Sequence, residues 1–253
     1  MKRTLALLLA LTLLLTATLA AAEGELRGYT REDGYVYVSL GYYPQTAEGG
    51  YLPVIWRVLT VDDEKAYLCS EYVLFARPMH PDLTAYKTLG VDFGQTELCR
   101  YLNTEFAETA FSGAELDLLI PFETYGRIFL LDKEDVKNKD IGMGTGNGPI
   151  RNGEVGLRAW GTDYAIANGL YRFQNKYGAH SPYWTRNQST TDKRHALCIK
   201  DGGQLGHIEV GRENEGVRPA AYLDLSLAVI GGGTGTLEDP YTFVLPEAEN
   251  TTE

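Results

Sequence analysis

Apolar residues in the first third of the chain come in short, dense runs. Residues 35–40 form one run, residues 54–61 a second, and residues 66–70 a third that follows a polar stretch. Such runs of β-branched and aromatic residues, bounded by turn residues, predict strands. The second and third runs therefore predict an antiparallel hairpin. Arg57 interrupts the second run, and we expect its side chain to face outward, the commoner arrangement in a strand.

The spacing of apolar residues changes after Thr96. Leucine, phenylalanine and alanine then recur every fourth residue, which places them on one face of a helix. The residues on this face are Leu98, Leu102, Phe106 and Ala110. Ser112, followed three residues later by Glu115, predicts a capping box that begins a second short helix. Pro121 marks the end of that helix.

The middle of the chain alternates short predicted elements with a long polar segment. Residues 127–131 predict a further strand, and Asp132 is placed to cap the turn that follows. Residues 137–153 are rich in glycine and asparagine and predict a loop with almost no side chains to bury. Thr162 then begins a short helix that Gly169 closes.

The second half predicts four closely spaced strands joined as a meander, at residues 183–186, 195–199, 207–210 and 217–225. Arg218 lies among strand formers, and its planar guanidinium can hold two carbonyl groups or a carboxylate at once. We therefore expect Arg218 to be a structural anchor, together with the core tryptophans Trp56 and Trp184. Residues 231–233 predict a glycine linker before a closing segment at 234–244.

These patterns predict an α+β fold, a single compact domain of antiparallel strands with a few short helices and long irregular loops. The predicted domain spans residues 23–245 of the 253. We predict one domain because no linker divides the chain into two parts of different amino-acid composition. The tail at 246–253 is polar and is expected to be disordered.

The N-terminus is typical of a secretory signal peptide covering residues 1–22. Lys2 and Arg3 precede a long apolar run, and three alanines at 20–22 form a small-residue cleavage site. An uncleaved membrane anchor is the alternative, but the run is shorter than the roughly 20 residues that a spanning helix needs. The sequence therefore predicts a secreted protein with no membrane contact after cleavage.

The charge of the chain is strongly acidic. Loss of Lys2 and Arg3 with the signal peptide takes the formal charge from −11 to −13. Such a surface repels nucleic acid and anionic membranes, and it offers no counterion release for binding phosphates. We therefore expect no nucleic-acid partner.

The three cysteines, Cys69, Cys99 and Cys198, form an odd set. In an exported protein one pair can form a disulfide and leave one thiol, and the sequence does not choose among the three pairings. Cys69 with Cys99 is the pairing we consider. The alternative, three buried thiols that behave as small apolar residues, is favoured.

Several motifs, in this order and spacing, resemble a bacterial domain-of-unknown-function family, number 6273, which is common in exported proteins. The match extends over nearly all of the mature chain. The motifs are residues 41–45, 55–59, 100–103 with Phe106 and 110–111, 129–131, 162–165 with Gly169, 183–186 and 216–220, and residues 233–236 with 239–241 resemble the tail that often follows. The Trp-Thr-Arg segment and the later Gly-Val-Arg-Pro-Ala segment are also similar, more distantly, to the formylglycine-generating-enzyme and C-type-lectin-like folds. That resemblance implies irregular loops on a small sheet scaffold. Only Cys198 lies where the catalytic branch has a cysteine pair, so its oxidative activity is not implied.

The sequence carries no complete catalytic motif. It has no Gly-x-Ser-x-Gly elbow, no His-Glu-x-x-His pair, no EF-hand loop and no Walker lysine in its glycine-rich loop. We therefore predict no metal, no cofactor and no catalytic residue. Paired carboxylates for glycoside hydrolysis stay open as an alternative, since sequence spacing does not determine their separation.

Aromatic rings beside fixed polar groups suit sugars, peptides or wall fragments. The sequence predicts such a ligand-binding surface around residues 137–187. Its candidate residues are Trp160, Tyr164, Tyr183, Arg186 and Asn187. The resulting hypothesis is an exported, non-catalytic module that binds an extracellular glycan, wall fragment or protein. The alternatives are an enzyme acting on carbohydrate or cell wall, and a structural surface module.

Overall fold

A computed structural model describes residues 26–89, 92–144, 157–175 and 178–245 of the chain. The predicted signal peptide at 1–22 and the predicted tail at 246–253 lie outside the described residues, as does most of the predicted loop at 137–153. The part of that loop that is described buries two apolar side chains, Ile141 and Met143. The prediction that this segment has almost nothing to bury was therefore wrong for residues 137–144.

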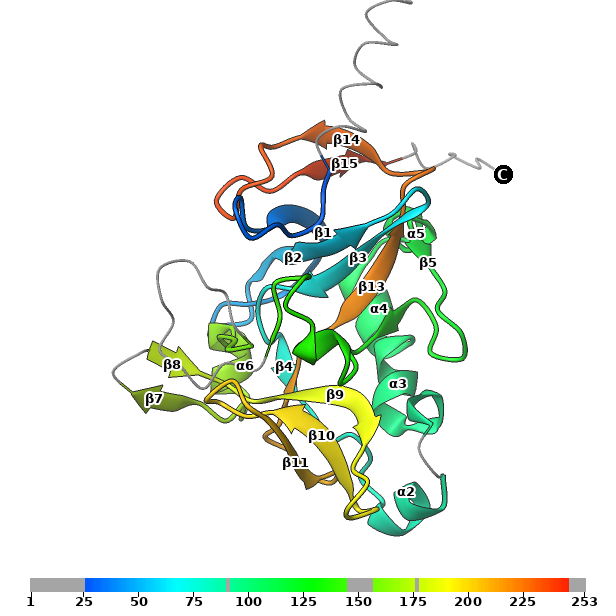
Figure 1. The fold of residues 1–253 in the computed structure, drawn as a ribbon, viewed down its shortest axis with the longest axis vertical. Helices are drawn as coiled ribbons and strands as arrows, with labels where there is room; N and C mark the ends of the chain where they lie inside the picture. The colour runs from blue at the N-terminus through cyan, green and yellow to red at the C-terminus, as the bar shows by residue number, and fades with distance from the viewer. Residues whose placement is uncertain (1–25, 90–91, 145–156, 176–177, 246–253) are drawn as a thin grey trace, which may run out of the picture.

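A six-stranded sheet contains the predicted hairpin (Figure 1). Its strand order is β1-β2-β3-β13-β5, and β6 also pairs with β13. β2 and β3 pair antiparallel, which confirms the predicted hairpin. The strands are β1 Val36–Pro44, β2 Tyr51–Val61, β3 Lys65–Ser70, β5 Leu119–Ile120, β6 Ile128–Phe129 and β13 Ala220–Asp224.

A second sheet has five strands in the order β11-β10-β9-β12-β4 and lies toward the opposite end of the molecule (Figure 1). The strands β9, β10 and β11 form an antiparallel meander, as predicted. The fourth predicted strand is divided, because β12 belongs to this sheet and β13 to the first. Pro219 separates them, and proline has no N–H to continue a ladder. The strands are β4 Phe75–Ala76, β9 Tyr183–Gln188, β10 His195–Ile199, β11 Leu205–Glu209 and β12 Gly216–Val217.

Two further strand pairs flank these sheets. The predicted glycine linker forms part of a strand, β14, which pairs with β15. This pair is joined to the first sheet by a parallel bridge between Val38 and Tyr241. The other pair, β7 with β8, lies beside the second sheet (Figure 1). Their bounds are β7 Phe173–Asn175, β8 Gly178–His180, β14 Val229–Gly232 and β15 Thr242–Val244.

The helical stripe predicted after Thr96 forms two short helices instead of one. The break falls at Asn103, whose amide nitrogen donates to the carbonyl of Ile128 at 2.8 Å and whose oxygen accepts from Ile128 N at 3.0 Å. The predicted capping box of Ser112 and Glu115 is confirmed, but the helix it begins is only five residues long. The helices are α2 Leu83–Leu89, η1 Phe93–Gln95, α3 Glu97–Leu102, α4 Glu105–Ala110, α5 Gly113–Asp117, η2 Asp135–Lys137 and α6 Asp163–Ala167.

One continuous core of buried apolar side chains joins the two sheets and the helices beside them. The fold is therefore a single α+β domain of mostly antiparallel strands with a few short helices. Trp56 and Trp184 are fully buried in this core. Each indole N–H donates to a backbone carbonyl, that of Leu40 at 2.9 Å for Trp56 and that of Arg77 at 2.8 Å for Trp184. None of the helices in the described ranges is both long and apolar enough to cross a membrane.

Two arginines lie inside this core. The expectation that Arg57 faces outward was wrong: its side chain is fully buried and donates from Nη2 to Glu71 Oε1 at 2.7 Å and from Nε to Glu71 Oε2. The reason is the acid, since the carboxylate offsets the cost of removing the guanidinium charge from water. Arg218 is also buried; it donates to the carbonyl of Ser70 at 2.7 Å and to the hydroxyl of Tyr183 at 3.3 Å.

Candidate functional site

The residues expected to bind a ligand on β9 instead hold the fold together. Tyr183 is fully buried, and its hydroxyl donates to the carbonyl of Leu157 at 2.8 Å. Arg186 forms an ion pair with Asp132 at 2.8 Å and donates to the carbonyl of Leu130 at 2.7 Å. Their polar groups are already satisfied within the protein, so neither presents a free group to a ligand.

Asn187 has a similar structural contact, because its side-chain oxygen accepts from the backbone N–H of Lys133 at 2.7 Å. Tyr164 lies on α6, half-buried, with its ring edge-on to Tyr43 at 6.2 Å. Trp160 differs from the others: it is 37% exposed, and its ring centre lies 4.9 Å from that of His180. The five expected ligand residues therefore do not form one binding surface.

The cysteines do not form the bridge considered for Cys69 and Cys99. All three thiols are free and buried, with Cys69 on β3, Cys99 on α3 and Cys198 on β10. Burial raises the pKa of each thiol. A protonated, buried thiol is a poor nucleophile, so none of the three is placed for thiolate chemistry.

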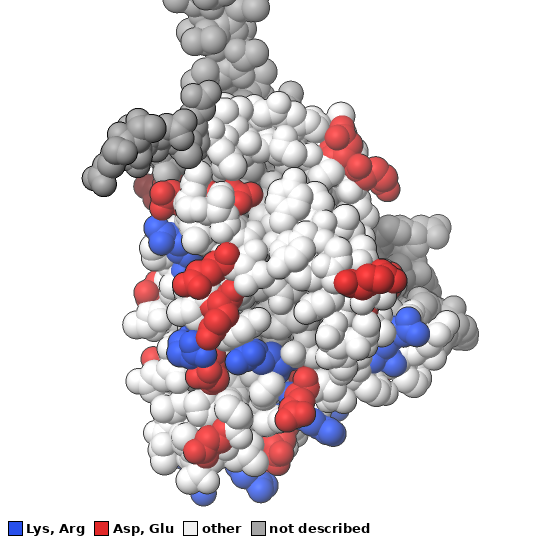
Figure 2. Space-filling view, turned by 180° about the vertical axis from the view of Figure 1, so that it is seen from behind, with Lys and Arg blue, Asp and Glu red and all other residues white. Residues whose placement is uncertain are grey.

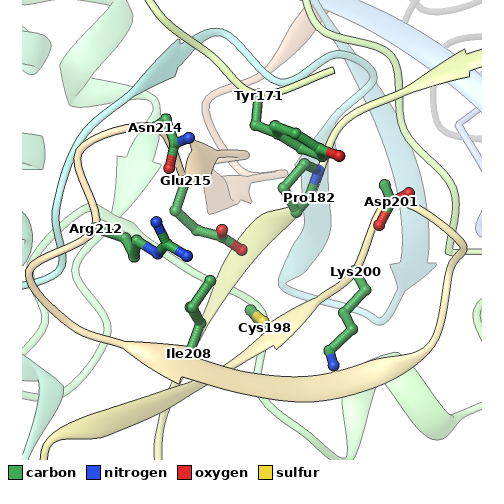
Figure 3. A pocket seen from close by; sticks show the side chains of 9 residues that line it. All are labelled: Tyr171, Pro182, Cys198, Lys200, Asp201, Ile208, Arg212, Asn214 and Glu215. Atoms are coloured by element: carbon green, nitrogen blue, oxygen red, sulfur yellow. The ribbon is translucent and has the colours of Figure 1, made fainter. Parts of the chain in front are cut away.

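A cavity of about 350 Å³ opens beside β10 and β11, and none of the five expected ligand residues lines it (Figure 3). This volume lies in the range of small-molecule sites. Its walls combine an aromatic ring, three apolar or weakly polar side chains and five polar ones. The lining residues are Tyr171, Pro182, Cys198, Lys200, Asp201, Ile208, Arg212, Asn214 and Glu215.

Glu215 is positioned by the strand that follows it. Its backbone carbonyl accepts from Arg77 N at 3.1 Å, and the next residue, Gly216, pairs with both β9 and β4. The backbone on both sides of the acid is thus fixed between two strands. The side chain points into the cavity beside Arg212 and above the sulfur of Cys198 (Figure 3). Only 2% of Glu215 is exposed, and its Oε1 has no hydrogen-bond partner among the described residues.

Burial raises the pKa of Glu215 to about 7. The Cys198 thiol and the Arg212 guanidinium favour the ionised form, whereas the charge of Asp201 opposes it, and burial outweighs all of them. The carboxyl is therefore partly protonated near neutral pH and can both donate and accept hydrogen bonds. Strongly shifted acids in a concave site are typical of functional groups.

The rim of the cavity supplies further polar groups from two loops. Lys200 and Asp201 lie in the turn between β10 and β11, which is closed by a bond from Gly203 N to the carbonyl of Lys200 at 2.7 Å. Tyr171, 44% exposed, is tied to the opposite rim because its N–H donates to the carbonyl of Asn214 at 3.0 Å. An exposed ring thus lines the same cavity as donors and acceptors from both loops.

The described residues contain no group of three or more histidine, cysteine, aspartate or glutamate side chains that could hold a metal ion. On the face opposite that of Figure 1, acidic and basic side chains are interspersed (Figure 2). In the described part of that face, the basic side chains form no continuous patch of the kind that tracks a phosphate backbone.

The sequence did not identify the acid of this cavity. Glu215 stands directly before the Gly-Val-Arg-Pro motif at 216–219, which we had assigned to structure. The sequence did show an acid next to a predicted buried strand. A buried acid must either pair with a positive charge or become neutral through a raised pKa. Lys200, Asp201 and Arg212 gave no signal, since surface turns are normally charged.

No protein family, curated protein or solved structure matches the chain. The resemblance to the domain-of-unknown-function family 6273 and the likeness to C-type-lectin-like folds therefore stay predictions.

Proposed function

We propose that this protein is an exported binding domain that holds one sugar unit of an extracellular glycan or wall fragment in the Glu215 cavity. The single observation that carries the proposal is the buried Glu215 carboxyl, whose Oε1 has no hydrogen-bond partner among the described residues, in a 350 Å³ space that Tyr171 also lines. An unsatisfied polar group in a preformed cavity favours a ligand that can complete its hydrogen bonds.

The chemistry of the walls supports a sugar over a purely apolar ligand. The hydroxyls of a sugar both donate and accept, and they match a partly protonated carboxyl, the carboxylate of Asp201 and the amide of Asn214. The apolar face of a sugar ring packs on an exposed aromatic ring such as Tyr171. Lys200 and Arg212 add two cationic donors on the rim, which suit a sugar that carries an acidic group.

Thermal unfolding of residues 23–253 with a panel of sugars, uronic acids and muropeptides tests this proposal. A ligand that binds only the folded protein raises the melting temperature in a saturable way. Tyr171→Ala should weaken binding by about fivefold, from roughly 1 kcal/mol for a stacked ring. Tyr51→Ala is the matched control, because Tyr51 is 55% exposed and does not line the cavity.

Two further variants test the carboxyl. Glu215→Leu should abolish binding, since it removes the polar floor, whereas the exposed neighbour Glu213→Leu should not change it. Absence of any saturable shift with the whole panel, or equal effects of Tyr171→Ala and Tyr51→Ala, would refute the sugar site. A protein ligand would then become the better hypothesis.

A second candidate function is glycoside hydrolysis, and one observation favours it: two acids, Glu215 and Asp201, line the same cavity. A buried carboxyl with a pKa of about 7 fits the general acid, and a second carboxylate fits the nucleophile or base. Release of reducing ends from a glycan would then fall as the pH rises above about 7. Glu215→Gln would remove this activity but keep binding, because its amide still donates and accepts. Binding without any product in the wild type would exclude this candidate.

A further inference from the structure

Three aromatic side chains form a line across the β7–β8 pair, next to the Glu215 cavity. Phe173 lies directly opposite His180 in the register of these two strands. On the other side of β8, an antiparallel bridge joins Ala159 to Ser181, with a bond from Ser181 N to the carbonyl of Ala159 at 2.9 Å. This register places Trp160 opposite His180, and their ring centres are 4.9 Å apart.

Residues directly opposite one another in neighbouring strands project their side chains to the same face. Trp160, His180 and Phe173 therefore share one face, and we name them the ring ladder. Its two ends are exposed, 37% for Trp160 and 44% for Phe173, whereas His180 between them is buried. Burial and the nearby Arg158 lower the pKa of His180, so its ring is neutral at pH 7.

The ring ladder is continuous with the cavity. Tyr171 stands two residues before Phe173, and Pro182 stands two residues after His180. Side chains two positions apart in an extended chain lie on the same face, about 7 Å apart. Tyr171 and Pro182 both line the cavity, and their side chains lie side by side in Figure 3. The ring ladder thus lies two residues along the chain from each member of this pair.

We propose that the ring ladder is a second glycan subsite, which binds the sugar unit next to the one held in the cavity. This inference rests on the proposed function and adds the class of ligand: a chain of at least two sugar units. Exposed aromatic rings at the edge of a polar cavity suit a linear glycan, because each sugar ring offers an apolar face for stacking and hydroxyls at its edge.

The test compares affinities for short and long forms of one sugar by titration calorimetry. The probes are glucose, N-acetylglucosamine and glucuronic acid, each with its linear tetramer. We expect the tetramer of the bound sugar to bind the wild type about fivefold more tightly than the single unit, from one additional stacked ring. Phe173→Ala should remove this advantage and leave the affinity for the single unit unchanged.

Phe173→Leu keeps an apolar side chain without the ring and should lose most of the same advantage. Leu227→Ala is the control for loss of an exposed apolar side chain, since Leu227 is 52% exposed and outside both sites. Equal affinity of the wild type for the single unit and the tetramer would overturn the second subsite while leaving the cavity site intact. A Phe173→Ala variant that weakens both probes equally would also overturn it. Failure of every probe to bind would overturn both proposals.

Discussion

The buried ion pair between Arg57 and Glu71 offers the sharpest test of how this fold is held together. Glu71→Gln keeps the size and shape of the side chain but removes its charge. In the native protein the carboxylate accepts from two nitrogens of Arg57, one of them at 2.7 Å. The side chain of Arg57 is fully buried, and that of Glu71 is 5% exposed. The variant therefore leaves a buried guanidinium without its counter-charge.

The expected loss of stability is large. Removal of one partner of a buried ion pair costs about 3–5 kcal/mol in the free energy of unfolding, because the other charge remains desolvated. Arg218 is buried in the same cluster, and its positive charge repels that of Arg57 once the carboxylate is removed. For a domain of this size the melting temperature should fall by about 6–20 °C.

Urea denaturation and calorimetry of both proteins measure this difference. The control is Glu97→Gln in the exposed pair with Arg100, where the side chains are 33% and 48% exposed. Such a surface pair contributes about 0–1 kcal/mol. A Glu71→Gln variant no less stable than Glu97→Gln would refute the conclusion that Arg57 depends on Glu71.

The pH dependence of stability checks the same pair. Burial alone raises the pKa of Glu71, but the Arg57 guanidinium outweighs it, and the net pKa is below the usual value. The carboxylate therefore stabilises the protein above the unfolded pKa of about 4.3, and this contribution is lost as the pH falls through the lower folded value. The difference in stability between wild type and Glu71→Gln should shrink in that acidic range.

Three further predictions concern the cavity, a strand crossing and the thiols. Because the folded pKa of Glu215 is raised to about 7, ionisation of this carboxyl opposes folding. The free energy of unfolding, measured by urea denaturation, should therefore fall by at most about 3 kcal/mol from about pH 4.5 to 7. Glu215→Gln should remove this pH dependence, whereas Glu213→Gln should keep it. Gly216→Ala should destabilise the protein more than Gly113→Ala, as measured by thermal unfolding. A Cβ added at residue 216 would lie 2.4 Å from the carbonyl oxygen of Pro182, whereas a Cβ added at residue 113 would meet nothing within 4 Å. Thiol titration without reductant should detect three groups after denaturation and almost none before, and fewer than three would contradict the free cysteines.

The strands and turns of the chain could be predicted where local signals decide them. The β2–β3 hairpin follows from two apolar runs around a polar turn, and the capping box follows from Ser112 and Glu115. The helix after Thr96 was predicted as one element because its apolar spacing is continuous. The break arises from Asn103, whose side chain binds the backbone of Ile128, 25 residues later. No local pattern reports such a contact.

The candidate site could be predicted only in its general chemistry. Aromatic rings next to polar groups were expected near residues 160–187, and Trp160 is indeed exposed there. Tyr183 and Arg186, however, were assigned to the ligand because a sequence does not show which polar groups already have partners. Glu215 was missed because its cavity is built by residues from four separate segments between Tyr171 and Glu215.

The sequence by itself determined the strand-rich α+β class and most of the strand positions, since side-chain alternation and turn residues act over a few neighbours. Only the tertiary structure decided which sheet each strand joins and which charges are buried. At Pro219 the chain passes from the second sheet to the first. Arg57 forms its ion pair with Glu71, which lies directly after β3. The raised pKa of Glu215 likewise depends on burial, which exists only when distant segments pack around the same carboxyl.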